Sequence, residues 1–211
     1  MKNLLIIGAR GLGREVYDLS CSCQGYESEF IVRGFLDDNV DALKGLNGYP
    51  PIISSVENYV PQDGDIFACA LGNPIHKKKY VEIILEKGGE FINLIHPSAH
   101  IGQNCKHGKG LIMFNNSHIG QDVRLGDFVT FDGQGSVGHD CHIGNYTHIG
   151  AQSSVAGFCM IADCVTINPG AHIIPHCQIG ENAVIGIGSI VINKVRPNTT
   201  VFGNPAKKID L

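Results

Sequence analysis

Residues 119–154 read IGQDVR LGDFVT FDGQGS VGHDCH IGNYTH IGAQSS, six blocks of six that share one pattern. The same frame runs without an insertion over sixteen blocks, residues 101–196. The first position is apolar in every block except the one that begins at His107, the second is often Gly or Ala, and the fifth is usually small or β-branched. Because a large apolar residue recurs every sixth position, neither a helical period of 3.6 nor plain strand alternation fits. The period predicts a solenoid, and specifically a β-helix with one aliphatic side chain inside each flat side.

The composition is that of a folded protein with one large domain or two small ones. The 211 residues are 43% apolar and 17% charged, with a formal net charge of −4. No basic patch marks a nucleic-acid-binding protein, so we expect no nucleic-acid partner. The N-terminal apolar run is too short for a signal peptide, and no run of about eighteen apolar residues predicts membrane insertion. We therefore expect a cytoplasmic protein with reduced thiols.

Residues 1–96 follow a different rule, with expected strands alternating with expected helices. This alternation predicts a parallel sheet with helical crossovers, a Rossmann-like α/β fold. The expected strands are 2–8, 30–38, 65–73 and 91–95, and the expected helices are 13–22 and 74–88.

Three of these strands end in residues suited to ligand binding. GARGLG occupies residues 8–13, Asp37 and Asp38 end the second strand, and Gly72 and Asn73 end the third. Ligands of open parallel sheets bind beyond the carboxyl ends of the strands, and a glycine turn that opens a helix favours an anion. The glycine spacing is GxxGxG and the domain is about half a dinucleotide fold, so a single nucleotide fits better than NAD. A tight turn without a ligand is the alternative.

Several motifs occur in the order found in one enzyme family: IIGARGLGREV, FLDD, ALGN, NLIHPSA, VGHDCHIGNYTHIG and VFGNPAKKI. Over essentially its whole length the chain resembles the hexapeptide-repeat sugar acetyltransferases of the sialic acid O-acetyltransferase and nucleotide-aminosugar N-acetyltransferase group. The resemblance implies a Rossmann-like nucleotide-sugar-binding domain at 1–96 and a left-handed parallel β-helix acetyltransferase domain at 97–211. It also implies three hexads in each coil, about five coils, acetyl-CoA as co-substrate, a sugar or nucleotide-sugar acceptor in surface polysaccharide or glycan synthesis, and a homotrimer.

The resemblance also assigns roles to residues of this chain. His139 would be the general base with Asp140 as its acid partner, and His148, nine residues later, would contact acetyl-CoA. Gly157 would offer a backbone N–H to the oxyanion of the thioester carbonyl. Many members that use UDP-sugars have His at the position of Leu12. Further implied contacts are Pro169, Ile187 and Gly188 for acetyl-CoA, and Arg10, Gly11, Leu12, Asp37, Asp38 and Gly72 for the acceptor.

The assigned chemistry suits these residue types. Acetyl transfer from a thioester needs a base that removes the proton of the acceptor amine or hydroxyl. Histidine suits this role because its unperturbed pKa of about 6.5 lies near neutral pH. An adjacent carboxylate can fix the tautomer of the imidazole and stabilise its cation. We expect direct attack without an acetyl-enzyme, because Cys141 has the phase of an inward-pointing residue.

The hexad phase also separates the histidines. The first and fifth positions point inward, whereas His139 at the third position and His142 and His148 at the sixth are expected to point outward. His142 is then a surface residue. The cysteines at fifth positions, including Cys141 and Cys159, are expected to pack inside the coils rather than bind metal. Two other classes stay open: a zinc enzyme resembling gamma-class carbonic anhydrases, and a non-catalytic β-helix scaffold.

Overall fold

The computed structural model describes residues 1–209, which divide into two compact units, residues 1–97 and the chain from residue 98 onward. No helix within residues 1–209 is long and apolar enough to cross a membrane. Each unit is described by itself below.

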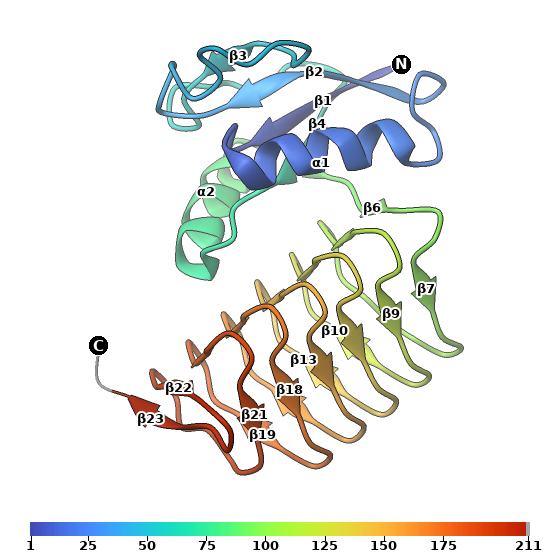
Figure 1. The fold of residues 1–211 in the computed structure, drawn as a ribbon. Coiled ribbons are helices and arrows are strands. Elements are labelled where there is room, and N and C mark those ends of the chain that lie inside the picture. Colours follow the sequence, from blue (N-terminus) through green and yellow to red (C-terminus); the bar gives the residue numbers. More distant parts are fainter. Residues whose placement is uncertain (210–211) are drawn as a thin grey trace. The chain divides into compact units, whose positions relative to one another are not determined.

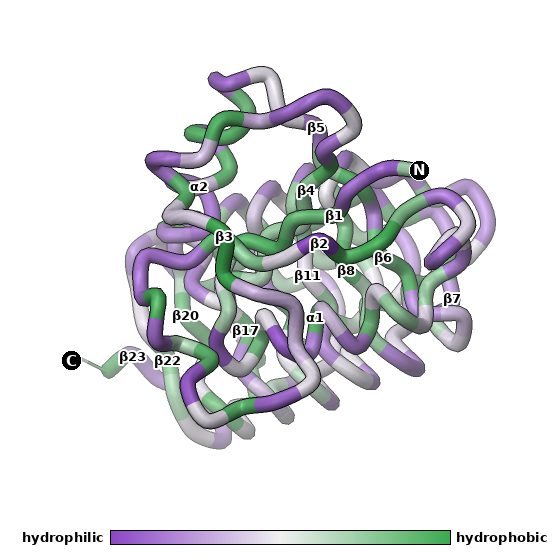
Figure 2. The backbone as a smooth tube through the Cα atoms, turned by 90° about the horizontal axis from the view of Figure 1, so that it is seen from above, coloured by the Kyte–Doolittle hydropathy of each residue, from purple (hydrophilic) through white to green (hydrophobic). Residues whose placement is uncertain are grey.

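Unit 1 is a parallel five-stranded sheet in the order β3-β2-β1-β4-β5. The central strands are almost fully buried, and Figure 2 shows the hydrophobic character of the chain through β1 and β4. Helices α1 and α2 are the crossovers between parallel strands. Helix α1 buries Val16 and Leu19, and helix α2 buries Val81 and Ile84. The alternation expected from the sequence is confirmed. The bounds are β1 Lys2–Ile7, α1 Gly11–Ser22, β2 Phe30–Leu36, β3 Ile52–Ser54, β4 Asp65–Cys69, α2 Pro74–Glu86 and β5 Glu90–Phe91.

Two details of unit 1 differ from the expectation. Strand β3 was not foreseen, because its three residues are half-buried or exposed and carry no clear apolar pattern. It is the edge strand of the sheet and, among the described residues, pairs with β2 alone. The single strand expected at 91–95 is broken into β5, which ends at Phe91, and β6 (Leu94–Ile95). The break falls at Ile92 and Asn93, so the apolar run predicted a longer continuous strand than the structure has.

Unit 2 is the coiled part of the chain, in which two-residue strands recur every six residues (Figure 1). The first-position residues from Met113 to Val191 are all buried, as are the fifth-position residues from Leu111 to Val195. The strands are β7 His100–Ile101, β8 Ile112–Met113, β9 His118–Ile119, β10 Arg124–Leu125, β11 Thr130–Phe131, β12 Ser136–Val137, β13 His142–Ile143, β14 His148–Ile149, β15 Ser154–Val155, β16 Met160–Ile161, β17 Thr166–Ile167, β18 His172–Ile173, β19 Gln178–Ile179, β20 Val184–Ile185, β21 Ile190–Val191, β22 Thr200–Phe202 and β23 Lys207–Ile209.

These strands form three sheets, which we number. The strands of unit 2 in sheet 1 are β8, β11, β14, β17, β20, β22 and β23, and sheet 2 contains β7, β9, β12, β15, β18 and β21. Sheet 3 contains β10, β13, β16 and β19. Strands β7 to β18 each pair in parallel with the strand eighteen residues later, as in Thr130 with His148, so one coil holds three hexads. At the C-terminal end β20 pairs in parallel with β22, and β22 pairs in antiparallel with β23. The expected left-handed parallel β-helix is confirmed.

The fourth position of the hexad makes the corners. From Asn104 to Asn182 every fourth-position residue has a positive φ, between 56° and 68°. This left-handed conformation is favourable for Gly, Asn and Asp and costly for bulky residues. We call the turns from sheet 2 to sheet 3 the His139 corner, and the turns from sheet 1 to sheet 2 the Pro169 corner. The irregular start expected at His107 is also found: that residue is exposed, and no strand forms there.

Candidate functional site

The carboxyl ends of β1, β2 and β4 meet at a cleft of about 580 Å³ in unit 1. Asp37 orders this edge, because its two carboxylate oxygens accept hydrogen bonds from the N–H groups of Ala9 (2.8 Å) and Asn39 (2.9 Å). Asp38 is exposed and accepts a hydrogen bond of 2.7 Å from the hydroxyl of Tyr80. The cleft is lined by Ile7, Gly8, Arg10, Leu12, Gly13, Leu36, Asp37, Asp38, Asn39, Val56, Ala70, Leu71, Gly72, His76 and Tyr80.

The turn from β1 to α1 depends on its glycines. Gly8 has a φ of 95°, and a Cβ at Gly13 would lie 2.0 Å from the carbonyl oxygen of Gly8. This close approach starts α1 at the cleft. Arg10 is the N-cap residue, and no side chain caps the helix there. The first-turn N–H groups therefore have no partner within the helix and, with the guanidinium, make a suitable place for an anion.

Most of the predicted substrate residues meet in this cleft. Arg10, Leu12 and Gly72 line it together with the two aspartates, whereas Gly11 does not. Asp37 is held by backbone donors, so its role is to order the loops, and Asp38 is the more accessible acid. Sequence reasoning missed His76 and Tyr80. Both lie on α2, and the signal was their spacing of four residues, which places them on one face of a helix.

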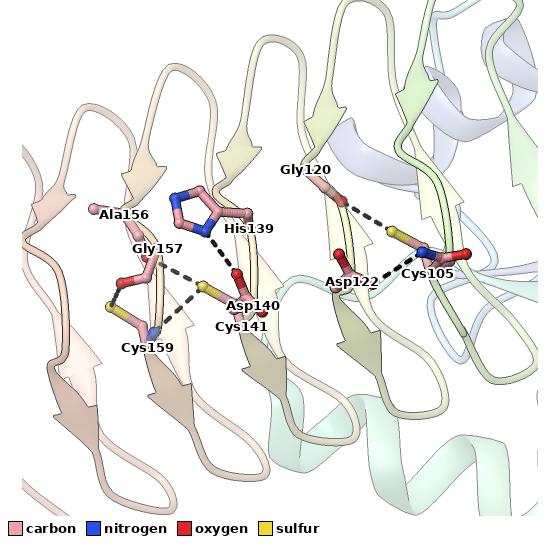
Figure 3. A network of polar contacts seen from close by, with 10 residues as sticks. Cys105, Gly120, Asp122, His139, Asp140, Cys141, Ala156, Gly157 and Cys159 are labelled. Atoms are coloured by element: carbon pink, nitrogen blue, oxygen red, sulfur yellow. Dashed lines mark hydrogen bonds and ion pairs between the residues drawn. The ribbon is translucent and has the colours of Figure 1, made fainter.

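His139 and Asp140 lie on the His139 corner of unit 2, between β12 and β13. The Nδ1–H of His139 donates to Oδ2 of Asp140 at 2.8 Å (Figure 3), because an ionised carboxylate can only accept. Asp140 occupies the fourth position with a φ of 57°, which Asp tolerates, and this conformation carries its carboxylate toward the preceding residue. Both side chains are about half exposed. The bond leaves Nε2 of His139 with a free lone pair in the neutral ring.

Gly157 lies one coil beyond His139 on the same corner (Figure 3). A Cβ at this position would lie 2.8 Å from both Cε1 and Nε2 of the His139 ring. Glycine therefore provides the space that the imidazole fills. Among the described residues no acceptor takes the N–H of Gly157, whereas its carbonyl accepts from the N–H of His176. The predicted oxyanion donor thus lies next to the predicted base.

An aromatic column continues from His139. The ring of Phe158 meets His139 edge-on at a centroid distance of 5.0 Å and stacks on His176 at 5.0 Å. Phe158 has a φ of 60°, an unusual conformation for a bulky residue, and its side chain is half exposed. Such an outlier persists only when its surroundings hold it in place. The sequence did not predict this column, because the fourth-position residues of the preceding coils on this corner are Asn104, Asp122 and Asp140.

His148, which the hexad phase places on the outside of the coil, is almost fully shielded from solvent. His148 is only 8% exposed, and its Nε2 lies 2.9 Å from Oδ2 of Asp132. The hexad phase gives the direction of a side chain relative to the coil axis, and it does not tell whether the outer face of a sheet is covered. His142 is exposed on sheet 3, as expected.

The predicted acetyl-CoA contacts do not all meet within one chain. Pro169, Ile187 and Gly188 lie on the Pro169 corner, where the N–H of Gly188 donates to the carbonyl of Pro169 at 3.0 Å. Ile187 is 63% exposed. His139 and Gly157 lie on the other corner of sheet 2, and His148 lies on sheet 1.

The structure also bears on the zinc alternative. His139, His142 and His148 lie on a corner, on sheet 3 and on sheet 1, so they do not converge within the chain. Within residues 1–209 no three His, Cys, Asp or Glu side chains are grouped to hold a metal ion. Cys141 and Cys159 are fully buried inside the coils, which confirms their packing role.

The N-terminal unit matches a known protein family. Residues 3–84 match the PglD N-terminal domain. The chain is also 27% identical over 117 residues to the UDP-N-acetylbacillosamine N-acetyltransferase of Bacillus subtilis (strain 168). The aligned region covers 54% of this chain and 51% of that protein. The chain thus aligns with about half the length of this curated relative.

Solved structures extend the similarity to the whole chain. The acetyltransferase domain of PglB from Neisseria gonorrhoeae FA1090 is 26% identical, with a TM-score of 0.89 over 99% of this chain and 100% of that one. The same domain in complex with acetyl coenzyme A gives a TM-score of 0.87. PerB from Caulobacter crescentus, in complex with CoA and GDP-perosamine, shares the fold, with a TM-score of 0.85 and 22% identity over 100% of this chain and 98% of that one. The three comparisons agree: the N-terminal unit is similar to the PglD N-terminal domain, part of the chain is similar to a nucleotide-sugar N-acetyltransferase, and the whole chain is similar in structure to the acetyltransferase domain of PglB.

Proposed function

We propose that this protein transfers the acetyl group of acetyl-CoA to an amine of a nucleotide-linked sugar in glycan biosynthesis. The observation that carries the proposal is the His139 corner, where Asp140 holds one ring nitrogen and the other is adjacent to Gly157. The cleft of unit 1 supports a nucleotide-linked acceptor, because it offers a helix N-terminus and Arg10 to a phosphate. An amine rather than a hydroxyl is favoured by the named activity of the Bacillus subtilis relative.

In the proposed reaction His139 acts as the general base. Its Nε2 removes a proton from the acceptor nitrogen as that nitrogen attacks the thioester carbonyl carbon. The N–H of Gly157 stabilises the negative charge on the carbonyl oxygen, and Asp140 stabilises the imidazolium. When the carbon–sulfur bond breaks, the imidazolium returns the proton to the departing thiolate. The products are the acetylated sugar and CoA.

The proposal includes a homotrimer with sites between neighbouring chains. A coil with three flat sides suits threefold packing. The two groups of predicted acetyl-CoA contacts also occupy different corners of the chain, with Gly157 on one and Pro169 on the other. If a single acetyl-CoA touches both groups, two chains must supply them. We propose a cytoplasmic reaction, because acetyl-CoA and nucleotide-sugars are cytoplasmic metabolites.

The test is acetyl-CoA consumption by the purified protein with a panel of UDP- and GDP-linked amino sugars and sialic acids. We expect turnover with at least one nucleotide-amino sugar. Replacing His139 with Ala should lower kcat by at least about 100-fold, the usual contribution of a positioned base. His142→Ala is the matched control, because His142 is an exposed histidine three residues away and should leave the rate unchanged. A wild-type rate in His139→Ala would refute the assignment.

A further inference from the structure

Phe158 combines a strained backbone with an exposed ring, one coil beyond Asp140 on the His139 corner. Its φ of 60° lies in the left-handed region, which is costly for a bulky residue. Phe128 has a similar φ of 59° but is only 2% exposed, so the burial of its ring offsets that cost. Phe158 is 48% exposed, and burial offsets much less there. The strain at Phe158 therefore calls for a reason other than the packing of its own ring.

Polar side chains at the fourth hexad position hydrogen-bond from one coil to the next. On the His139 corner the side-chain amide of Asn104 donates to Oδ1 of Asp122 at 3.1 Å. On the Pro169 corner the amide of Gln152 donates to the side-chain oxygen of Gln134 at 3.3 Å. The residue that follows Asp140 in this series is Phe158, whose phenyl ring has no donor. The side chain of the next coil thus does not compete with His139 for the carboxylate of Asp140.

The ring of Phe158 also restricts the imidazole of His139. One hydrogen bond of 2.8 Å, from Nδ1–H to Asp140, leaves a half-exposed ring free to swing about that bond. Phe158 meets this ring at 89° with a centroid distance of 5.0 Å, a favourable edge-to-face geometry. Phe158 is itself stacked on His176, with an interplanar angle of 5°. The phenyl ring is therefore a second, supported point of contact for the imidazole.

We propose that Phe158 is a positioning residue that holds the imidazole of His139 and leaves the carboxylate of Asp140 to His139 alone. This inference rests on the proposed function, in which His139 is the base. Phe158 acts through His139 and takes no part in the proton transfer. The left-handed backbone is then the cost of placing an aromatic ring where Asn or Asp would be relaxed.

Phe158→Asn tests the inference, because Asn tolerates the left-handed conformation and brings an amide donor to Asp140, as Asn104 does to Asp122. In scanning calorimetry the variant should unfold at the wild-type temperature or higher. Its kcat should nevertheless fall about 10-fold, the upper range for one aromatic contact. KM for acetyl-CoA should change less than about 3-fold, because no contact with acetyl-CoA is removed. A structural role would instead lower kcat and the unfolding temperature together, and that result would overturn the inference.

Two further variants complete the comparison. Phe158→Tyr keeps the ring and should keep the wild-type kcat, so a Tyr variant as slow as the Asn variant would contradict the inference. Tyr146→Asn is the matched control. Tyr146 is also an aromatic residue at a fourth position, with a φ of 60°, and it stacks on Phe128 at 5.3 Å. It lies in the turns between sheets 3 and 1, away from the proposed base, so its replacement should leave kcat unchanged.

The double variant His139→Ala/Phe158→Asn separates the inference from the proposed function. If Phe158 acts through His139, kcat of the double variant should equal that of His139→Ala within about 2-fold. A further 10-fold fall would show that Phe158 acts on another group and would overturn the inference. So would an effect of Phe158→Asn confined to KM for the sugar, which would make Phe158 a substrate contact. If His139→Ala is inactive and Phe158→Asn keeps the wild-type kcat, the inference fails while the proposed function stands.

Discussion

The absence of a side chain at Gly157 makes room for the imidazole of His139. In Gly157→Ala the new methyl group would lie 2.8 Å from Nε2, so the ring must swing away. We expect kcat to fall about 100-fold, because a displacement of about 1 Å at a reacting group has that effect. Stability should change little, because the half-exposed ring can move into solvent.

The matched control for this variant is Gly133→Ala. Gly133 is also at a third hexad position, and the nearest atom to its Cβ would be Oδ1 of Asn115 at 3.2 Å, the movable end of a side chain. Its acetylation rate should equal that of the wild type in an acetyl-CoA consumption assay. Equal rates for both alanine variants would mean that the base is not at this corner.

The residues of the site differ in how far the sequence could predict them. The contact between His139 and Asp140 was predictable, because the two residues are adjacent and the hexad phase puts His139 outside the coil. The burial of His148 was not, because the period of six carries no information about what covers a sheet. Phe158 was also missed, since its contact with His139 joins two coils and depends on a backbone conformation that its residue type disfavours.

At the scale of elements, the turn from β1 to α1 is a tightly packed part of the cleft of unit 1. A methyl group in Gly13→Ala would fall 2.0 Å from the carbonyl oxygen of Gly8, and backbone atoms cannot move aside cheaply. We expect a loss of about 3 kcal/mol in the free energy of unfolding of unit 1. In Gly11→Ala the Cβ meets nothing within 4 Å, so stability should be unchanged or slightly raised.

Urea unfolding followed by circular dichroism at 222 nm measures both effects. The signal reports unit 1, because both helices of the described chain, α1 and α2, lie there. Equal midpoints for the two variants would contradict the steric role of Gly13.

The elements themselves were largely predictable, for a physical reason. Strands β1 and β4 are buried on both faces, so their sequences are continuous apolar runs bounded by turn residues. Strand β3 escaped prediction because it lies at the edge and is partly exposed. The corners of the β-helix follow from the six-residue period, but the left-handed fourth position was not foreseen, because residues as different as Asp140 and Phe158 occupy it.

Alkaline pH should weaken unit 1 through its buried thiols. Burial raises the pKa of Cys69 from 9.0 to about 12, and Lys77 nearby offsets this only in part, while burial raises the pKa of Cys23 to about 11. Between pH 9 and these values the unfolded thiols ionise and the folded ones do not. The contribution of these thiols to the free energy of unfolding should therefore be constant well below pH 9 and fall above it.

Urea unfolding at pH 8 and pH 10.5, monitored at 222 nm, measures this decrease. Cys69→Ala removes one of the contributing thiols, so its decrease between the two pH values should be smaller than that of the wild type. A decrease of the same size in both proteins would show that Cys69 does not contribute.

At the scale of the whole molecule, the proposed site is divided between two corners of the chain. His139 and Gly157 lie between sheets 2 and 3, whereas Pro169 and Ile187 lie between sheets 1 and 2. Threefold packing would bring the first corner of one chain to the second corner of its neighbour. Each variant with a defect at one corner would then keep an intact copy of the other corner.

This arrangement predicts that two inactive variants complement each other. His139→Ala removes the base, and Ile187→Glu places a charge on the other corner. When the two proteins are unfolded together in equal amounts and refolded, a quarter of the interfaces in randomly mixed trimers join two undamaged corners. We expect about a quarter of the wild-type acetylation rate from the mixture, and almost none when the variants are refolded separately and then combined. If each chain holds a complete site of its own, every chain in the mixture carries one defect, and co-refolding restores nothing.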